Sequence, residues 1–332
     1  MGWWSAIYKT AANDWVFEEL KPNQVPEPVP QNDVPLETYL TVTLKSMRVV
    51  NVRKGLKKFY GVVHSFAAVP HASGDMAQFN KVVSPDQLKE LDAEHVDRVI
   101  QVDQPLVGPI PYRGGNVELE VGLFSVASSD LAGPYISLLT DISVKAGVSF
   151  IGVALPFVEP LKQGIQLLTG SKANADLEIG VATNRTPRTG WWVVIRAKKG
   201  SITVGDLKVT PNYYRLVQPD GSFVKDYPYM VFSITSAEER KDWFLIPVLK
   251  EPYAKLNADL QKGNFNEVKT SLKVFQRASE TCLDLTYEDG KKVAALVVKR
   301  TNDMLQRAKM RRQTEELPEL SELPLYAARS AD

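Results

Sequence analysis

Two histidines and an aspartate lie close together in the chain, at His64, His71 and Asp75. A histidine oriented by a carboxylate can activate a serine hydroxyl, and Ser65 and Ser73 belong to the same segment. Neither serine is surrounded by the GxSxG turn that exposes a nucleophile. His64 falls on an expected strand and His71 in the loop after it, so no helical spacing brings them together. A hydrolase that uses His64, His71 and Asp75 is therefore the third alternative, and structural histidines are the preferred interpretation.

Metal and cofactor ligands do not occur in an established pattern either. The spacing of the histidines and Asp75 matches no zinc motif, and the chain lacks a glycine-rich phosphate loop. Its one cysteine, Cys282, falls on the apolar stripe of an expected helix, where cysteine is usually a small core residue. We predict that the protein is not an enzyme and has no catalytic residue, no metal site and no cofactor.

The strongest positive signal is aromatic and lies near the start of the chain. Residues 1–20 carry five large aromatic side chains, at Trp3, Trp4, Tyr8, Trp15 and Phe17. Exposed tryptophan and tyrosine are enriched in the hot spots of protein interfaces. This N-terminal arm is therefore predicted to dock on a partner protein or on another copy of the chain. The alternative is that the arm folds back onto its own body.

A proline-rich segment, residues 21–35, follows the arm. Its prolines are Pro22, Pro26, Pro28, Pro30 and Pro35. Proline removes a backbone donor and fixes φ, so the segment is predicted to be an extended, semi-rigid spacer rather than a packed element. An aromatic arm on such a spacer is typical of an element that reaches out and docks.

The overall charge argues against one class of partner. The chain has 40 basic and 39 acidic residues, for a formal net charge of +1. A dedicated nucleic-acid binder usually needs a strong positive excess, because phosphate neutralisation supplies most of its affinity. Nucleic acid is therefore disfavoured as a partner.

One local basic cluster supports an alternative function. It lies in an expected loop between strands and consists of Arg53, Lys54, Lys57 and Lys58. Such a cluster could contact anionic lipid headgroups. The apolar run at residues 146–158 is shorter than the ~18 residues of a spanning helix, although it could insert after a conformational change. The alternative function is thus a membrane-active module. The preferred interpretation of the cluster is ordinary surface charge that is exposed to solvent.

The cysteine content and the N-terminal residues bear on the compartment. A single cysteine excludes an intramolecular disulfide, and the first twenty residues carry Trp, Asp and Glu where a signal peptide needs an apolar core. Both features favour a reducing compartment, and we expect a cytoplasmic protein.

Strands are the elements expected to position most of these residues. Alternating or β-branched runs predict strands at residues 39–44, 59–66, 98–102, 117–123, 176–181, 191–195, 212–217 and 229–234. Turn residues dominate 107–115, and helical spacing replaces the alternation at about 129–170. We expect a mainly β (α+β) fold with a β-sandwich-like body over residues 36–248 that contains a helical insertion.

The remainder is predicted to be helical and then flexible. Apolar residues spaced by three and four predict C-terminal helices over residues 249–313, with one helix starting at Pro252 and a break at Gly263-Asn264. Residues 314–332 form an acidic tail with Leu-Pro pairs, either a solvating polymer or a peptide ligand for a partner. The preferred function is a non-enzymatic protein-interaction module: a scaffold, an adaptor or a regulatory subunit of a larger assembly or homo-oligomer.

Overall fold

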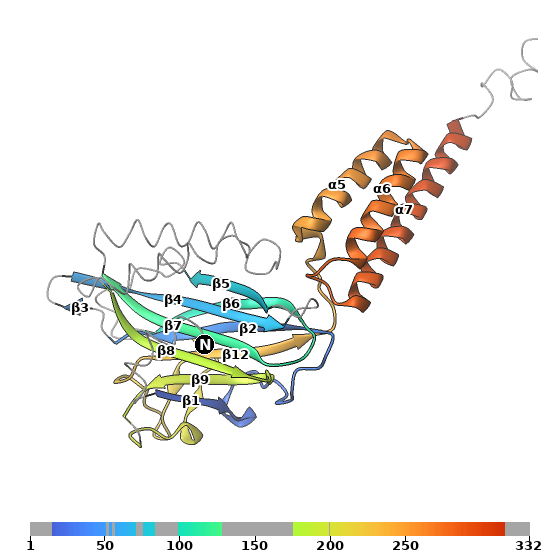
Figure 1. Cartoon of the computed structure of the whole chain (residues 1–332). Helices are drawn as coiled ribbons and strands as arrows, with labels where there is room; N and C mark the ends of the chain where they lie inside the picture. Colours follow the sequence, from blue (N-terminus) through green and yellow to red (C-terminus); the bar gives the residue numbers. More distant parts are fainter. Residues whose placement is uncertain are drawn as a thin grey trace, which may run out of the picture. The chain divides into compact units, whose positions relative to one another are not determined.

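The computed structural model describes residues 15–50, 53–54, 57–70, 76–83, 99–127, 175–198 and 200–315. The chain divides into two compact units, Met1–Arg240 and Lys241–Asp332. Strands make up the first unit and helices the second (Figure 1). The predicted mainly β body with C-terminal helices is therefore confirmed. The predicted helical insertion lies outside the described residues.

The first sheet of the body has five strands in the order β1-β9-β12-β2-β6, all paired antiparallel. Their bounds are β1 (Trp15–Leu20), β9 (Gly190–Arg196), β12 (Tyr229–Ala237), β2 (Thr38–Arg48) and β6 (Val99–Tyr112). The prediction of a turn over residues 107–115 is wrong for residues 107–112, because β6 continues to Tyr112. The strand passes close to β2 at Gly108, where a Cβ would lie 2.2 Å from the Leu40 carbonyl oxygen.

The second sheet is built on the long strand β4 (Lys57–Pro70). This strand pairs with its neighbours β3 (Arg53–Lys54), β5 (Met76–Val83) and β7 (Val117–Ala127), and β7 pairs in turn with β8 (Ala175–Arg185). The register is continuous over most of each pair. The alternation of apolar and polar residues therefore selects the face that each side chain occupies.

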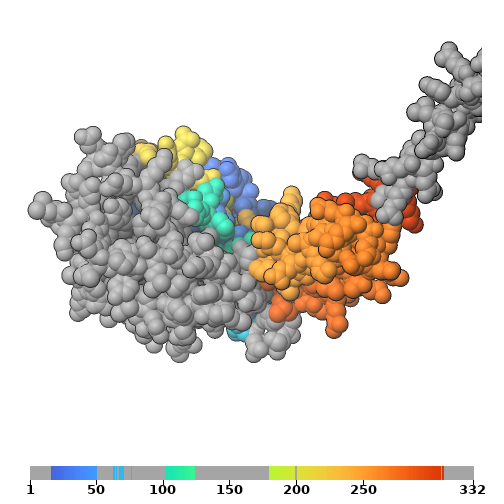
Figure 2. All heavy atoms as spheres, turned by 90° about the horizontal axis from the view of Figure 1, so that it is seen from above, coloured from blue at the N-terminus to red at the C-terminus, as the bar shows by residue number. Residues whose placement is uncertain are grey.

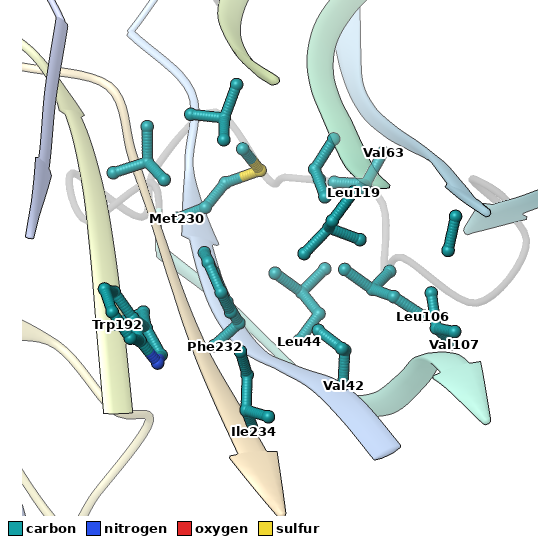
Figure 3. Packing of buried hydrophobic residues seen from close by; sticks show 14 of the residues in the cluster. Val42, Leu44, Val63, Leu106, Val107, Leu119, Trp192, Met230, Phe232 and Ile234 are labelled. Atoms are coloured by element: carbon teal, nitrogen blue, oxygen red, sulfur yellow. The ribbon is translucent and has the colours of Figure 1, made fainter. Parts of the chain in front are cut away.

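One hydrophobic core lies between the two sheets. Val42, Leu44 and Phe232 of the first sheet share a cluster of buried side chains with Val63 and Leu119 of the second. Figure 3 shows these side chains converging on a common interior. Each such side chain contributes about 1.5–3 kcal/mol when it is fully buried. The body is thus a β-sandwich, as its strand patterns predicted.

The opposite face of the first sheet is also covered. Residues 197–228, which include η4 (Val204–Asp206), β10 (Lys208–Val209) and β11 (Leu216–Val217), pack a second buried cluster against it. Strand β9 consequently buries both of its faces. The strand expected at residues 212–217 is reduced to its last two residues, because Tyr213 and Tyr214 adopt positive φ in a turn.

The prediction that residues 21–35 form an unpacked spacer is wrong. Gln24 is buried, and its side-chain amide donates hydrogen bonds of 2.7 Å to the carbonyls of Val204 and Leu207. Farther along, the backbone N–H of Val34 donates to the Pro187 carbonyl at 3.0 Å. The prolines lack donors, but the residues between them supply enough donors to hold the extended segment against the body.

The helical unit consists of η5 (Trp243–Leu245), α5 (Pro247–Lys262), α6 (Phe265–Glu280) and α7 (Tyr287–Glu315). Helix α5 begins earlier than predicted and contains Pro252 within it. The predicted break is confirmed: Gly263 ends α5 at φ 72°, and the Asn264 side chain accepts hydrogen bonds at the start of α6. Figure 2 shows the orange and red atoms of this unit as one closely packed group.

Aromatic rings and a buried carboxylate stabilise the interior of the helical unit. The Phe275 ring is fully buried, 5.8 Å from the centroid of Trp243 and 5.7 Å from that of Tyr253. The Ser271 hydroxyl donates to Asp259 at 2.5 Å, and this bond, with Lys255, holds the pKa of Asp259 below its usual value. Cys282 is buried, as predicted for a core residue, but its expected place on a helix is wrong, because α6 ends at Glu280. Within the described part of the chain, no helix is both long and apolar enough to cross a membrane.

Candidate binding site

The predicted hydrolase residues fall largely outside the described part of the chain. His64 lies on β4, whereas His71, Ser73 and Asp75 are among the residues that are not described. Ser65 is buried and donates its hydroxyl hydrogen to the Leu106 carbonyl at 3.1 Å, which makes it a structural group. Among the described ranges, no group of three or more histidine, cysteine or acidic residues could hold a metal ion. The hydrolase alternative stays a prediction.

The structure brings the four residues of the basic cluster together on a hairpin. Strands β3 and β4 pair so that Arg53 is opposite Lys58 and Lys54 is opposite Lys57. Whether the hairpin contacts an anionic surface stays a prediction.

The aromatic arm folds back where it is described. Trp3, Trp4 and Tyr8 lie outside the described residues, and Trp15 begins β1, an edge strand of the first sheet (Figure 1). The Phe17 ring stacks on Trp192 with centroids 5.1 Å apart. This packing matches the alternative in which the arm folds back onto its own body, and a docking role for Phe17 stays a prediction. Because side chains alternate along β1, Phe17 points into the sandwich and becomes part of its own body.

Phe17 forms one wall of a cleft between the two sheets. The cleft has an empty volume of about 380 Å³, which includes its open mouth. Its apolar walls are made by Phe17, Leu40, Val42, Val117, Leu119, Pro187, Trp192 and Ile234, and its polar lining by Thr183, Arg185 and Arg188. We call it the Arg185 cleft. Among the described residues, its lining contains no histidine, cysteine or carboxylate, so this part of the cleft offers an apolar interior with cationic groups.

The guanidinium of Arg185 lies across the aromatic wall. It is 4.3 Å from the centroid of the Trp192 ring and 4.7 Å from that of Phe17. Although the residue as a whole is exposed, partial burial of this group lowers the pKa of Arg185, with Glu19 opposing the shift and Arg188 adding to it. Within the described residues, the guanidinium has no hydrogen-bond or ion-pair partner. Among the described residues, its direct contacts are therefore the faces of these two rings, with the Glu19 carboxylate acting on it from farther away.

Arg188 has a different environment in the same lining. Its guanidinium lies 3.4 Å from a carboxylate oxygen of Glu19 and 3.4 Å from one of Asp33, and it also donates to the Gln31 carbonyl at 3.3 Å. Glu19 has room for this contact because Gly190 lacks a Cβ, which would lie 2.9 Å from the other carboxylate oxygen. Two carboxylates thus form ion pairs with Arg188, whereas Arg185 has no direct ion pair among the described residues and is affected by Glu19 only from a greater distance.

A second polar group of the cleft lacks a partner. The indole Nε1 of Trp192 is buried without a hydrogen-bond partner among the described residues. A buried donor that stays unpaired is costly, so such a group usually pairs with a buried water molecule. The arrangement suits a ligand that places an apolar side chain between the sheets and an anionic group beside Arg185.

A buried carboxyl group lies on the second sheet. Glu120 of β7 is 2% exposed, and its Oε2 atom has no hydrogen-bond partner among the described residues. Burial and the nearby Glu118 carboxylate raise the pKa of Glu120 from 4.5 to about 7. Because the folded state holds this proton more tightly than the unfolded chain, the resulting stabilisation is complete below about pH 4.5. It is lost as the pH rises toward 7.

Replacing this carboxyl should therefore flatten the pH dependence of stability. We expect Glu120→Gln to match the original chain at pH 4 and to exceed it by about 3 kcal/mol at pH 8. Urea unfolding across this range measures the difference. The exposed Glu238→Gln variant should follow the original curve. Parallel curves for Glu120→Gln and the original chain would contradict the raised pKa.

Sequence reasoning did not identify this cleft. In the sequence, Arg185 is a basic residue that precedes the strand expected at residues 191–195, and Trp192 belongs to the apolar run of that strand. The sequence feature that could have indicated it is a pair of arginines, Arg185 and Arg188, six and three residues before the Trp191-Trp192 pair. Comparisons of the chain with protein-family models, curated proteins and solved structures found no match.

Proposed function

We propose that the chain is a non-enzymatic protein-interaction module, a scaffold or adaptor, and that it binds a segment of a partner protein in the Arg185 cleft. One observation carries the proposal. The Arg185 guanidinium is stacked on Phe17 and Trp192 at an apolar cleft, without a counter-ion among the described residues.

Two energetic terms define the ligand. An aliphatic side chain that leaves water for the cleft gains about 1.5–3 kcal/mol when fully buried. A carboxylate beside Arg185 makes a charge-assisted hydrogen bond worth about 1.5–3 kcal/mol. The contacts of the guanidinium with the Phe17 and Trp192 rings do not supply such a hydrogen bond. The preferred ligand is therefore a peptide that carries a branched aliphatic residue next to an acidic residue.

Fluorescence anisotropy with short labelled peptides tests this proposal. A leucine–glutamate peptide should bind more tightly than leucine–lysine or serine–glutamate peptides of equal length, by on the order of tenfold. Arg185→Glu should reverse the preference between glutamate and lysine, because it inverts the charge at the mouth of the cleft. The control is Arg277→Glu on α6, an exposed arginine for which the same charge change should leave the preference intact.

Two outcomes would contradict the proposal. Equal binding of all three peptides would show that the cleft does not select this chemistry. Salt-sensitive binding to anionic vesicles, retained in Arg185→Glu but lost when Arg53, Lys54, Lys57 and Lys58 are all changed to glutamate, would favour the membrane-active alternative. The hairpin pairing of those four residues is the observation behind this second candidate.

A further inference from the structure

The C-terminal segment of the chain repeats the chemistry that the cleft selects. A triplet of glutamate, leucine and a third residue occurs three times in succession, as Glu316-Leu317-Pro318, Glu319-Leu320-Ser321 and Glu322-Leu323-Pro324. Leu325 and Tyr326 follow directly. Each triplet therefore carries an aliphatic side chain beside a carboxylate, and residues 316–326 contain no basic residue.

The spacing of this repeat matches a known mode of peptide recognition. A polyproline II helix has three residues per turn, so a triplet repeat in that conformation places its leucines along one edge and its glutamates along the next. Grooves lined by aromatic side chains bind such helices, whose backbone carbonyls have no internal hydrogen-bond partner. The aromatic wall formed by the stacked rings of Phe17 and Trp192 has the matching character.

Charge also favours this occupant. The cleft contains one guanidinium without a carboxylate partner among the described residues, whereas Arg188 is already compensated by Glu19 and Asp33. A ligand with one carboxylate next to each aliphatic residue would pair with Arg185 and would add no positive charge near Arg188. A basic or neutral apolar peptide would leave Arg185 uncompensated.

Resting on the function proposed above, we infer that the Arg185 cleft binds residues 316–326 of a second copy of the chain. A leucine of the repeat enters the apolar interior, and the preceding glutamate pairs with Arg185. Each copy has one cleft and one repeat, so the contact is heterologous. Such contacts either close into rings or continue as open chains.

The expected result is concentration-dependent self-association of the full chain. Sedimentation velocity should show a mass that rises with concentration, and a chain that ends at Glu315 should stay monomeric. Changing Leu317, Leu320 and Leu323 to serine should weaken association roughly 10-fold or more, since each site loses its aliphatic group. Arg185→Glu should have a similar effect, and Arg277→Glu should have none.

A charge exchange separates a direct contact from a structural effect. A chain in which Glu316, Glu319 and Glu322 are changed to arginine should not associate through the original cleft. The same chain should associate when it is mixed with the Arg185→Glu chain, because the charges of repeat and cleft are then exchanged. A full chain that is monomeric at every concentration would overturn the inference, as would an Arg185→Glu chain that associates normally.

Peptide binding distinguishes failure of this inference from failure of the proposed function. A synthetic peptide of residues 316–326 should bind the chain that ends at Glu315 more tightly than a peptide of the same composition whose leucines are not spaced by three. If leucine–glutamate peptides bind but the peptide of residues 316–326 does not, the inference is wrong and the proposed function stands. If none of them binds, both are wrong.

Discussion

A chain that lacks residues 1–35 should lose most of the stability of its β body. The deletion removes β1 from the edge of the first sheet and takes the Phe17 ring out of its stack with Trp192. It also removes the buried side chains of Leu20, Gln24 and Val34. Truncating one buried leucine already costs about 2–5 kcal/mol, and a whole domain is stable by only about 5–15 kcal/mol.

Near-UV circular dichroism during thermal unfolding measures this loss. A chain that lacks only residues 1–14 keeps every described residue and serves as the control. A finer comparison sets Leu20→Ala, at a side chain that is 1% exposed, against Glu18→Ala, at an exposed position of the same strand. An unchanged melting temperature after removal of residues 1–35 would contradict the packing of β1 and restore the hypothesis of an arm on a free spacer.

Phe275→Ala should destabilise the helical unit by about 3–5 kcal/mol, as is usual for the loss of a buried aromatic ring. The ring is fully buried and contacts both Trp243 and Tyr253, so its removal leaves a cavity among α5, α6 and η5. Because the chain divides into two compact units, we expect this variant to lower one calorimetric transition and to leave that of the β body in place.

The neighbouring position provides a matched control for this variant. Val274 precedes Phe275 on α6 but is 52% exposed, so Val274→Ala should have little effect on either transition. A single transition that shifts as a whole in Phe275→Ala would show that the two units unfold together. Equal losses for the two variants would contradict the packing around Phe275.

Local patterns were enough to predict the central strands. Residues 39–44 alternate with a period of two, residues 229–234 are a nearly continuous apolar and aromatic run, and these segments lie within strands β2 and β12 respectively. The break at Gly263-Asn264 was equally readable, because glycine at a helix end and asparagine at a helix start each have a local cause.

Long-range contacts explain the errors. The proline-rich segment is extended, as its composition required, but its packing depends on Gln24 reaching carbonyls about 180 residues later in the chain. No local rule indicates such a contact. The cleft was missed for the same reason, since Phe17, Arg185 and Trp192 come from three strands that only the tertiary structure brings together.

The pairing of β1 with β9 has a consequence for synthesis on the ribosome. Leu20 is opposite Trp191, so the partner of β1 is made about 170 residues after β1 itself. At a translation rate of roughly 5–20 residues per second, β1 waits on the order of ten to thirty seconds without its neighbour. During that interval the growing chain exposes an unpaired strand that contains Trp15 and Phe17. The first sheet can close at this edge only late in translation, and the nascent chain is open to chaperones and to misassociation until then.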